Sequence, residues 1–521
     1  MGGGIEMSVD WPNSWLGIPG ARCALHERKL GTVRDAFFLF ERLQGEAFCW
    51  WLDSAAGNPA DAGHSFMGAD PYAVLRVRGD DVEVDCLRAV RSDLEPGRTL
   101  LRGDPLATLR TLLPRLPARH ADRAACGEAP FVGGAVGYLG YEFGSQVEDI
   151  AFHTRDDLGL ADAVVLLVDQ VLVIDHRDDA LCVFGLGFGE SHGEATRAAR
   201  EAAARGATWA EGIKQRAGPP RTAPHRRPPH PEVSRVRGLR ADFDAHRYAK
   251  SVALVREEIR AGNCYQANLT QRMDLPFEGD PLALYQSLRT QNPAPFGAFL
   301  QLPEVTVLSS SPERFLRVTP DGIAESSPIK GTRPREVDLE ADAKNARELL
   351  HSAKDRAENL MIVDLVRNDL GRVCEPGSVE VPSLMRAEAF ATVHHLVSTI
   401  RGLLRPECDA LDALAASFPP GSMTGAPKIA AMRLLDRLEP VRRAVYSGAL
   451  GYFDVRGGVD LSVVIRTLLL KDGRAYLHVG GGVVMDSDPE AEYRESLDKA
   501  RVLLAVLDAF SDASSGAEPG C

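Results

Sequence analysis

The stretch GGGVVMDSDPEAEYRESLDKA, residues 480–500, joins the end of a predicted strand to the start of a predicted helix. The strand is expected near Ala475 to Val484 and the helix near Pro489 to Phe510. Within the helix, Glu492 and Glu495 are three residues apart and therefore lie on one face. Glu492 falls in the first turn, where acidic side chains are favoured anyway. This pair alone is thus typical of a solvated helix surface.

A second acidic pair has the same spacing. DRAENLMIVDLVRNDLGRV, residues 355–373, places Asp355 and Glu358 on one helix face. Lys354 and Arg356 could form surface ion pairs beside them, which would again indicate an ordinary solvated surface. Taken together, however, four carboxylates from two helices can form the oxygen-rich, partly hydrated site that Mg²⁺ prefers. The sequence therefore favours a magnesium site built from both helices.

Three glycine-containing segments could bring backbone N–H groups close to an anion. They are PIKGTRPR (328–335), GSMTGAPK (421–428) and VGGGVV (479–484). Glycine removes the side chain that would block the approach, and Pro427 can begin a helix whose amino end favours negative charge. Ordinary turns are the alternative interpretation. GSMTGAPK lacks the GxxxxGK[ST] pattern of a P-loop, so a small polycarboxylate is favoured over a nucleotide.

The composition divides the chain into four parts. Residues 1–204 are expected to form an N-terminal domain rich in antiparallel strands, because short β-like runs such as AVVLLV are separated by turn residues. The proline-rich residues 205–240 predict a linker, and a helix is expected to end just inside it, at Gly206. Residues 241–510 are expected to form a second domain and residues 511–521 a disordered tail. The fold class is α+β.

Further elements are expected inside the second domain. Helices are predicted near Asp338 to Arg372 and Pro427 to Leu438, and strands near Tyr446 to Val455 and Leu461 to Leu470.

Charge and cysteine content exclude several classes of protein. The net charge of -13 makes broad attraction to nucleic acid or anionic lipid unexpected. The nine cysteines are scattered without CxxC pairs, which is typical of reduced thiols in a cytoplasmic protein. The start of the chain carries acids where a signal peptide needs a basic segment, and no apolar stretch is long enough to span a bilayer.

Many short motifs resemble, in order, those of the chorismate-utilising enzymes. The motifs are SPERF (311–315), PIKGTRPR, DRAENLMIVDLVRNDLGRV, HLVSTIRG (395–402), GSMTGAPK, YSGALGYF (446–453), VIRTLLL (464–470) and GGGVVMDSDPEAEYRESLDKA. The resemblance covers residues 241–510, and FCWWLDS and SFMGADPY extend it to the N-terminal half. It implies large antiparallel β-sheets that are sandwiched and flanked by helices.

Two positions point to one branch of that family. Gln266 stands where the water-using members have a lysine base, and an amide is no base at neutral pH, so an ammonia-using member is favoured. Lys330 gives PIKGT, which resembles the aminodeoxychorismate synthases, whereas anthranilate synthases typically show PIAGT. CYQAN, residues 264–268, also resembles the aminodeoxychorismate branch. An anthranilate synthase or an aminodeoxyisochorismate synthase is the alternative, and a non-catalytic scaffold would have lost Lys330 or the carboxylates.

The resemblance implies a role for each matching residue. Lys330 would attack C2 of chorismate as the C4 hydroxyl leaves, Glu313 would be the acid/base, and Mg²⁺ would hold the ring carboxylate. Glu358 and Glu495 would bind the metal directly, and Asp355 and Glu492 through water. His395 would lie near the ring. The other matching positions around the substrate are Gly331, Thr332, Thr424, Gly425, Tyr446, Arg466, Gly480, Gly481, Gly482 and Lys499.

The sequence also suggests what another protein must supply. No GxCxGxQ-like segment indicates a glutaminase, so the ammonia is expected from a separate glutamine amidotransferase subunit. No segment remains for a pyruvate-releasing lyase, so the expected product is aminodeoxychorismate, on the route to 4-aminobenzoate and folate. In related proteins an N-terminal pocket binds tryptophan at an LLES motif. Here Trp51 to Ser54 reads WLDS, and feedback control by tryptophan is not expected.

Overall fold

The computed structural model describes most of the chain. The described residues are 5–10, 22–33, 35–54, 63–113, 129–211, 236–390 and 393–515. Most of the predicted linker (212–235) and the end of the predicted tail (516–521) lie outside the described residues.

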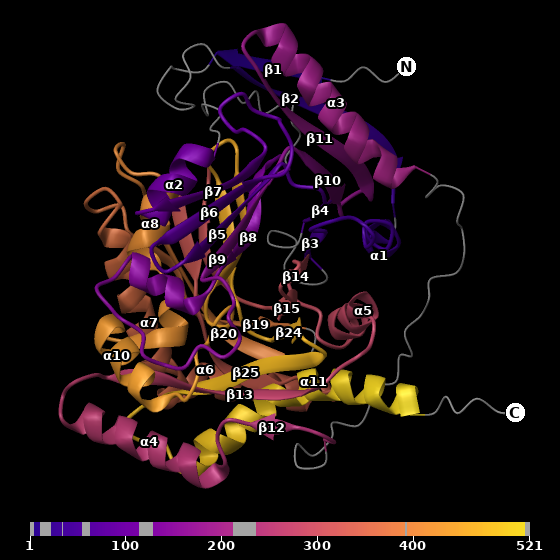
Figure 1. The fold of residues 1–521 in the computed structure, drawn as a ribbon. Coiled ribbons are helices and arrows are strands. Elements are labelled where there is room, and N and C mark those ends of the chain that lie inside the picture. The colour runs from indigo at the N-terminus through magenta and orange to yellow at the C-terminus, as the bar shows by residue number, and fades with distance from the viewer. Residues whose placement is uncertain are drawn as a thin grey trace, which may run out of the picture.

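Among the described residues, the first of two large sheets has 13 strands and takes them from both halves of the chain (Figure 1). Its strands from the N-terminal half are, in order across the sheet, β1 (Ile5–Asp10), β2 (Arg22–Thr32), β11 (Ala180–Gly189), β10 (Gln170–Asp175), β4 (His64–Gly68) and β3 (Trp50–Asp53). The order continues with β14 (Phe296–Gln301), β15 (Thr306–Ser311), β24 (Thr467–Lys471), β25 (Arg474–Val483), β13 (Gln266–Pro276) and β12 (Arg240–Ala241), and β21 (Gly425–Ala426) also pairs with β13.

The second sheet, as far as the structure describes the chain, has 12 strands, again from both halves. Its order is β18 (Ile329–Pro334), β20 (Val393–Leu403), β17 (Ile323–Ser327), β16 (Arg314–Val318), β23 (Val459–Val463), β22 (Ala449–Asp454), β8 (Gly134–Leu139), β9 (Ala163–Val168), β5 (Ala73–Arg78), β6 (Asp81–Cys86) and β7 (Gly97–Arg102), and β19 (Glu380–Ala389) also pairs with β20. Every pairing between named strands of the described residues is antiparallel.

The strands are apolar on both faces because both faces are covered. In β3, Trp50 packs between the sheets, where the Phe131 and Tyr452 rings stack with centroids 4.6 Å apart. The next residue, Trp51, points to the outer face of the first sheet and packs against Tyr285. Side chains of successive strand residues point to opposite faces, so one strand serves two cores. The predicted α+β fold, with sandwiched antiparallel sheets flanked by helices, is confirmed.

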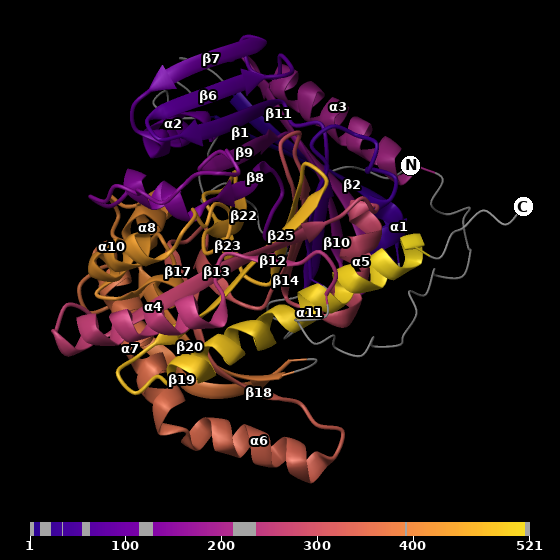
Figure 2. The same cartoon turned by 60° about the horizontal axis from the view of Figure 1, so that its bottom comes forward.

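The helices lie on the two outer faces and around the ends of the sheets (Figures 1 and 2). They are α1 (Ala36–Phe40), α2 (Pro105–Leu112), the 3₁₀ helix η2 (Tyr141–Gln146), α3 (His192–Ala210), α4 (Ala245–Arg260), α5 (Pro281–Gln291), α6 (Leu339–His351), α7 (Ala353–Gly371), α8 (Ala410–Ser417), α9 (Gly421–Thr424), α10 (Lys428–Leu438) and α11 (Pro489–Ser515). Helices α1, α3, α5 and α11 pack on the first sheet, and α2, α7 and α8 on the second. Among the described residues, no helix combines the length and apolar character needed to cross a membrane.

Three predicted elements differ from those observed. Helix α3 does not end at Gly206 but continues to Ala210, because its buried face extends through Ala207. Gly206 lies on this face and lets the helix approach Val183 of β11 closely. The helical region from Asp338 to Arg372 is two helices, since Ser352 ends α6 and caps α7. The strand predicted from Leu461 to Leu470 is also two, β23 and β24, because Arg466 has a φ of 53° and the chain passes there from one sheet to the other.

The predicted domain boundaries at residues 204 and 240 stay a prediction. Each sheet is continuous across them, through the pairing of β3 with β14 in the first sheet and of β8 with β22 in the second. The last helix also includes the first five residues of the predicted tail, since α11 runs to Ser515.

Candidate active site

A bulge in β18 directs Lys330 away from the regular sheet. The pairing of β18 with β20 shifts register between Lys330 and Thr332, and Gly331 between them has a φ of 82°. A Cβ at Gly331 would lie 2.8 Å from Leu349, so this position also has no room for a side chain. The Lys330 amine donates to the backbone oxygen of Ser422 at 2.9 Å. Burial lowers the pKa of Lys330 below its ordinary value, which favours the neutral, nucleophilic amine.

Glu313 lies beside the same strand, between β15 and β16, and is 4% exposed. Its carboxylate accepts from the backbone N–H of Ile329 at 3.3 Å, next to Lys330. Burial raises the pKa of Glu313 to about 7, although the Lys330 charge opposes the shift. A carboxyl group with this pKa can both give and take a proton near neutral pH.

The turn that receives the Lys330 amine belongs to GSMTGAPK. It contains α9 and β21, with Thr424 fully buried and Gly425 at a φ of 136°. A Cβ at Gly425 would clash with the backbone oxygen of Gln266 in β13. The Gln266 side chain is also fully buried, and neither its oxygen nor its nitrogen has a hydrogen-bond partner among the described residues.

Three glutamates converge on the glycines at the end of β25. A Cβ at Gly481 would lie 3.1 Å from an oxygen of Glu492 and 3.8 Å from one of Glu495. A Cβ at Gly482 would lie 3.6 Å from an oxygen of Glu358. The absence of side chains at these glycines therefore leaves room between α7 and α11, where three of the four predicted carboxylates meet.

Two lysines partly neutralise these glutamates. Lys354 Nζ is 3.3 Å from Glu492 Oε1 and 3.9 Å from Glu358 Oε1. Lys499 Nζ is 2.9 Å from Glu495 Oε1 and donates to the Gly480 oxygen at 2.8 Å. Burial raises the pKa of Glu358, whereas the neighbouring Lys499 lowers that of Glu495.

The site fits a magnesium ion in part. Mg²⁺ is usually held by one or two carboxylates together with water and substrate oxygens, and the three glutamates can supply that set. No group of three or more His, Cys, Asp or Glu side chains in the described ranges already has metal-binding geometry. Asp355, the fourth candidate, forms an ion pair with Arg333 at 2.9 Å and lies beside Gly331.

The remaining candidates surround the same space. Thr332 Oγ1 is 3.0 Å from Nδ1 of His395, and burial, together with the charge of Arg466, lowers the pKa of His395 to about 4. His395 is therefore a neutral imidazole at pH 7. Arg466 donates to the Lys499 backbone oxygen at 2.5 Å, and the Tyr446 ring stacks on His478 with centroids 5.1 Å apart.

Lys330 lies close to charged residues from several elements of the site. The charges that act on its amine are those of Glu358, Glu313, Lys499 and Glu495. Residues from β18, β25, α7, α9 and α11 thus form one cluster, which contains most of the residues that the sequence predicts for the site.

Comparison with known proteins identifies the family of this chain. The model of the chorismate binding enzyme family matches residues 48–505. The chain belongs to this family.

Two relatives and one solved structure show where this chorismate binding enzyme stands in the family. It is 42% identical over 499 residues to an aminodeoxychorismate synthase of Streptomyces pristinaespiralis, covering 94% of this chain and 66% of the relative. It is 37% identical over 473 residues to aminodeoxychorismate synthase component 1 of Escherichia coli (strain K12), covering 91% and 96%. The crystal structure of anthranilate synthase component I from Streptococcus pneumoniae superposes with a TM-score of 0.70 at 30% identity, covering 86% of this chain and 93% of that one.

Sequence reasoning missed some of what holds the chorismate binding enzyme's site together. Lys354 had an ordinary interpretation as a surface cation, but it lies between Glu358 and Glu492. Lys428, the last residue of GSMTGAPK, is 6% exposed and binds Asp369 at 2.9 Å, inside α7. Its position at the start of a helix with an apolar face gives no signal of a buried charge.

Proposed function

We propose that this protein is an aminodeoxychorismate synthase component 1, which converts chorismate and ammonia to 4-amino-4-deoxychorismate. The observation that carries the proposal is Lys330, a half-buried amine with a lowered pKa beside Glu313 and the three glutamates. An alanine at this position, as in the PIAGT pattern, would supply no nucleophile.

Lys330 would act by covalent catalysis. Its neutral amine attacks C2 of chorismate, the double bond shifts, and the C4–O bond breaks as Glu313 gives its proton to the departing hydroxyl, which leaves as water. Ammonia then attacks C4, the double bond shifts back, and the C2–N bond breaks to return the electron pair to Lys330. Glu313 takes the proton released from the new ammonium group. The first step needs Glu313 protonated and Lys330 neutral, which is the combination that burial favours.

The other residues would bind and orient the substrate. Glu358 and Glu495 would hold Mg²⁺ directly, and Glu492 and Asp355 through water. Bound there, the ion would fix and neutralise the ring carboxylate. Arg466 and Lys499 would suit the carboxylates of chorismate, and neutral His395, tied to Thr332, would pack near the ring. Thr424, Gly425 and Gly480 to Gly482 would line the pocket with backbone groups.

The ammonia would come from a glutamine amidotransferase subunit in the cytoplasm. The name component 1 of the Escherichia coli relative, which this chain matches over 96% of its length, supports a two-component system. The Streptomyces relative is longer, since this chain spans 66% of it. Glutamine-dependent turnover by the purified chain alone would contradict a separate subunit.

Product analysis tests the proposal. The full chain is incubated with chorismate, Mg²⁺ and an ammonium salt, and the products are separated and weighed by mass spectrometry. We expect aminodeoxychorismate from the wild type and a loss of about 1,000-fold or more in Lys330→Ala, the scale of losing an essential nucleophile. Lys344→Ala on the exposed face of α6 is the matched control and should retain activity. Anthranilate from the wild type would instead establish the C2-aminating alternative.

A further inference from the structure

Arg443, in the segment between α10 and β22, is a buried cation with every donor in use. It is 1% exposed, and its guanidinium has five N–H groups. Two of them donate to the carboxylate of Glu439, from Nε at 2.8 Å and from Nη2 at 2.6 Å. The other three donate to Met423 O at 2.8 Å, Ser447 Oγ at 3.3 Å and Asn268 O at 2.7 Å. The five donors therefore fix the group in one orientation.

The two backbone acceptors belong to two different walls of the active site. Met423 O lies in α9, directly before Thr424 and Gly425. Because the C=O and the next N–H of a trans peptide point in opposite directions, holding Met423 O also fixes the direction of the Thr424 N–H. Asn268 lies in β13, opposite Gly482 of β25. The guanidinium thus ties the GSMTG turn to the strand that pairs with the triglycine segment.

Further contacts hold Arg443 itself in place. Glu439 Oε1 also accepts from the Thr270 N–H at 2.9 Å and from Thr270 Oγ1 at 2.8 Å. The Tyr141 ring lies 4.4 Å from the guanidinium carbon. On the other side, Glu142 of η2 accepts from the backbone N–H groups of Arg443 at 2.9 Å and of Ala444 at 3.0 Å. The N-terminal half therefore supports the segment that carries Arg443.

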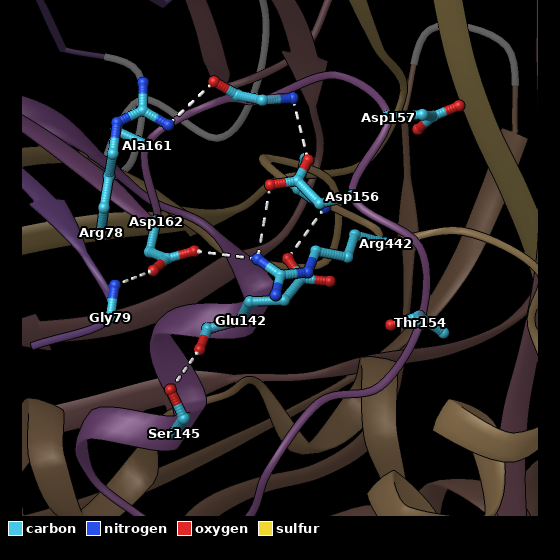
Figure 3. A network of polar contacts seen from close by, with 12 residues as sticks. Arg78, Gly79, Glu142, Ser145, Thr154, Asp156, Asp157, Ala161, Asp162 and Arg442 are labelled. Atoms are coloured by element: carbon cyan, nitrogen blue, oxygen red, sulfur yellow. Dashed lines mark hydrogen bonds and ion pairs between the residues drawn. The ribbon is translucent and has the colours of Figure 1, made fainter.

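The adjacent arginine makes a useful contrast. Arg442 points to another part of the molecule, where its Nη1 lies 3.5 Å from Asp156 Oδ2 and 3.9 Å from Asp162 Oδ1 (Figure 3). Its side chain is 31% exposed. Neither of its partners belongs to the active-site cluster.

We propose that Arg443 is a positioning residue, which holds the GSMTG turn against β13 so that Thr424 and Gly425 meet the substrate. The proposal rests on the proposed function, because it takes chorismate as the ligand of that turn. A buried ion pair is a weak source of stability compared with apolar packing. Two of the five directed hydrogen bonds instead connect two walls of one pocket, and the other three fix the orientation of the guanidinium. A lysine, with three donors and no planar fork, cannot reproduce them.

The test compares Arg443→Lys with Arg442→Lys in the full chain. Chorismate affinity is measured by calorimetry with Mg²⁺ and without ammonia, and hydrogen exchange of the 421–428 peptide is followed by mass spectrometry. We expect Arg443→Lys to weaken binding by about 10- to 100-fold, the effect of losing one or two hydrogen bonds to a charged group, and to speed exchange in that peptide. Arg442→Lys should stay within about twofold of the wild type, as for a partly exposed ion pair.

Each other outcome has a defined meaning. A folded Arg443→Lys that binds chorismate as tightly as the wild type overturns the positioning role. Faster exchange across both sheets with unchanged affinity shows a structural role only, and also overturns it. Should Arg443→Lys lack a cooperative melting transition, Glu439→Gln, which keeps the shape but removes the charge that orients Arg443, decides the matter by the same affinity criterion. A wild type that does not bind chorismate overturns the proposed function instead, before any variant is compared.

Discussion

Two buried acids in this protein have opposite surroundings, although each lies beside a basic residue. Asp53, on the outer face of the first sheet beneath α5, is 2% exposed and accepts from Arg289 at 2.7 and 3.2 Å and from Ser65 at 3.3 Å. Glu358, in the active site, has one ion pair among the described residues, with Lys354 at 3.9 Å, and the Lys330 charge also acts on it. The first acid has its donors, and the second has unused oxygens. Saturation with donors therefore distinguishes an acid that supports the fold from one that is available to a ligand.

The Asp53 carboxylate also borders a cavity. A cavity of about 300 Å³ is lined by Asp53, Ser54, His64 and Tyr452, among others. Because Arg289 occupies the Asp53 carboxylate and stacks on Trp51 at 4.8 Å, that acid has little capacity to bind the amino group of a ligand. Feedback control by tryptophan, which the WLDS segment already made unexpected, gains no support from this geometry.

The largest effect on turnover is expected at Glu313, an active-site acid whose pKa burial raises to about 7. Glu313→Gln should lower turnover by about 100- to 10,000-fold, the usual contribution of a general acid/base. The raised pKa of about 7 means that the proton-donating form is present below pH 7 and is lost above it. The wild-type rate should therefore fall above pH 7 as this group ionises, while the low-pH limb reflects deprotonation of Lys330. A rate–pH profile measures both, and an unchanged alkaline limb in Glu313→Gln would contradict the assignment.

At Asp53 the expected effect is on stability instead of turnover. Asp53→Ala leaves the Arg289 charge without its partner, and because Arg289 is 23% exposed we expect a loss of about 2 to 4 kcal/mol in the free energy of unfolding. Chemical denaturation measures it. Turnover per folded molecule should be unchanged, and a large fall in kcat at full folding would show that the Asp53 region acts on the active site.

Glu358→Gln should affect Mg²⁺ binding and not the stability of the metal-free protein, the opposite of Asp53→Ala. Burial raises the pKa of Glu358, so its charged form is disfavoured in the folded protein without metal. Removing the charge should leave the unfolding free energy in EDTA unchanged or higher. In contrast, the stabilisation by Mg²⁺ should need at least about 10-fold more metal, since one anionic ligand is lost. Melting temperatures across a Mg²⁺ series measure this, with exposed Glu348→Gln as the control, and an unchanged Mg²⁺ dependence would remove Glu358 from the metal site.

The sequence predicts more of this site than of the fold's connections. The carboxylate pairs, Lys330 and the glycine segments follow from helical spacing and motif resemblance. The sequence does not show that Arg466 ends one strand and sends the chain to the other sheet, because a non-glycine residue with positive φ is set by tertiary contacts. It also does not show that Lys428 and Arg443 are buried, since Lys428 binds Asp369 of α7 and Arg443 donates to Asn268 O of β13, both distant in the chain.

The smallest expected effect concerns the room that Gly481 leaves between the glutamates. A methyl group there would lie 3.1 Å from Glu492 Oε2 and 3.7 Å from Lys499 Nζ, both ends of flexible side chains that can shift. Gly481→Ala should therefore fold normally and weaken the binding of Mg²⁺ and chorismate by only several-fold, about 1 kcal/mol. Gly193→Ala in the first turn of α3, where nothing lies within 4 Å of the added carbon, is the matched control and should change neither affinity. Equal affinities in the two variants would show that the space at Gly481 is not used by the ligands, and that the free oxygens of the glutamates serve another purpose.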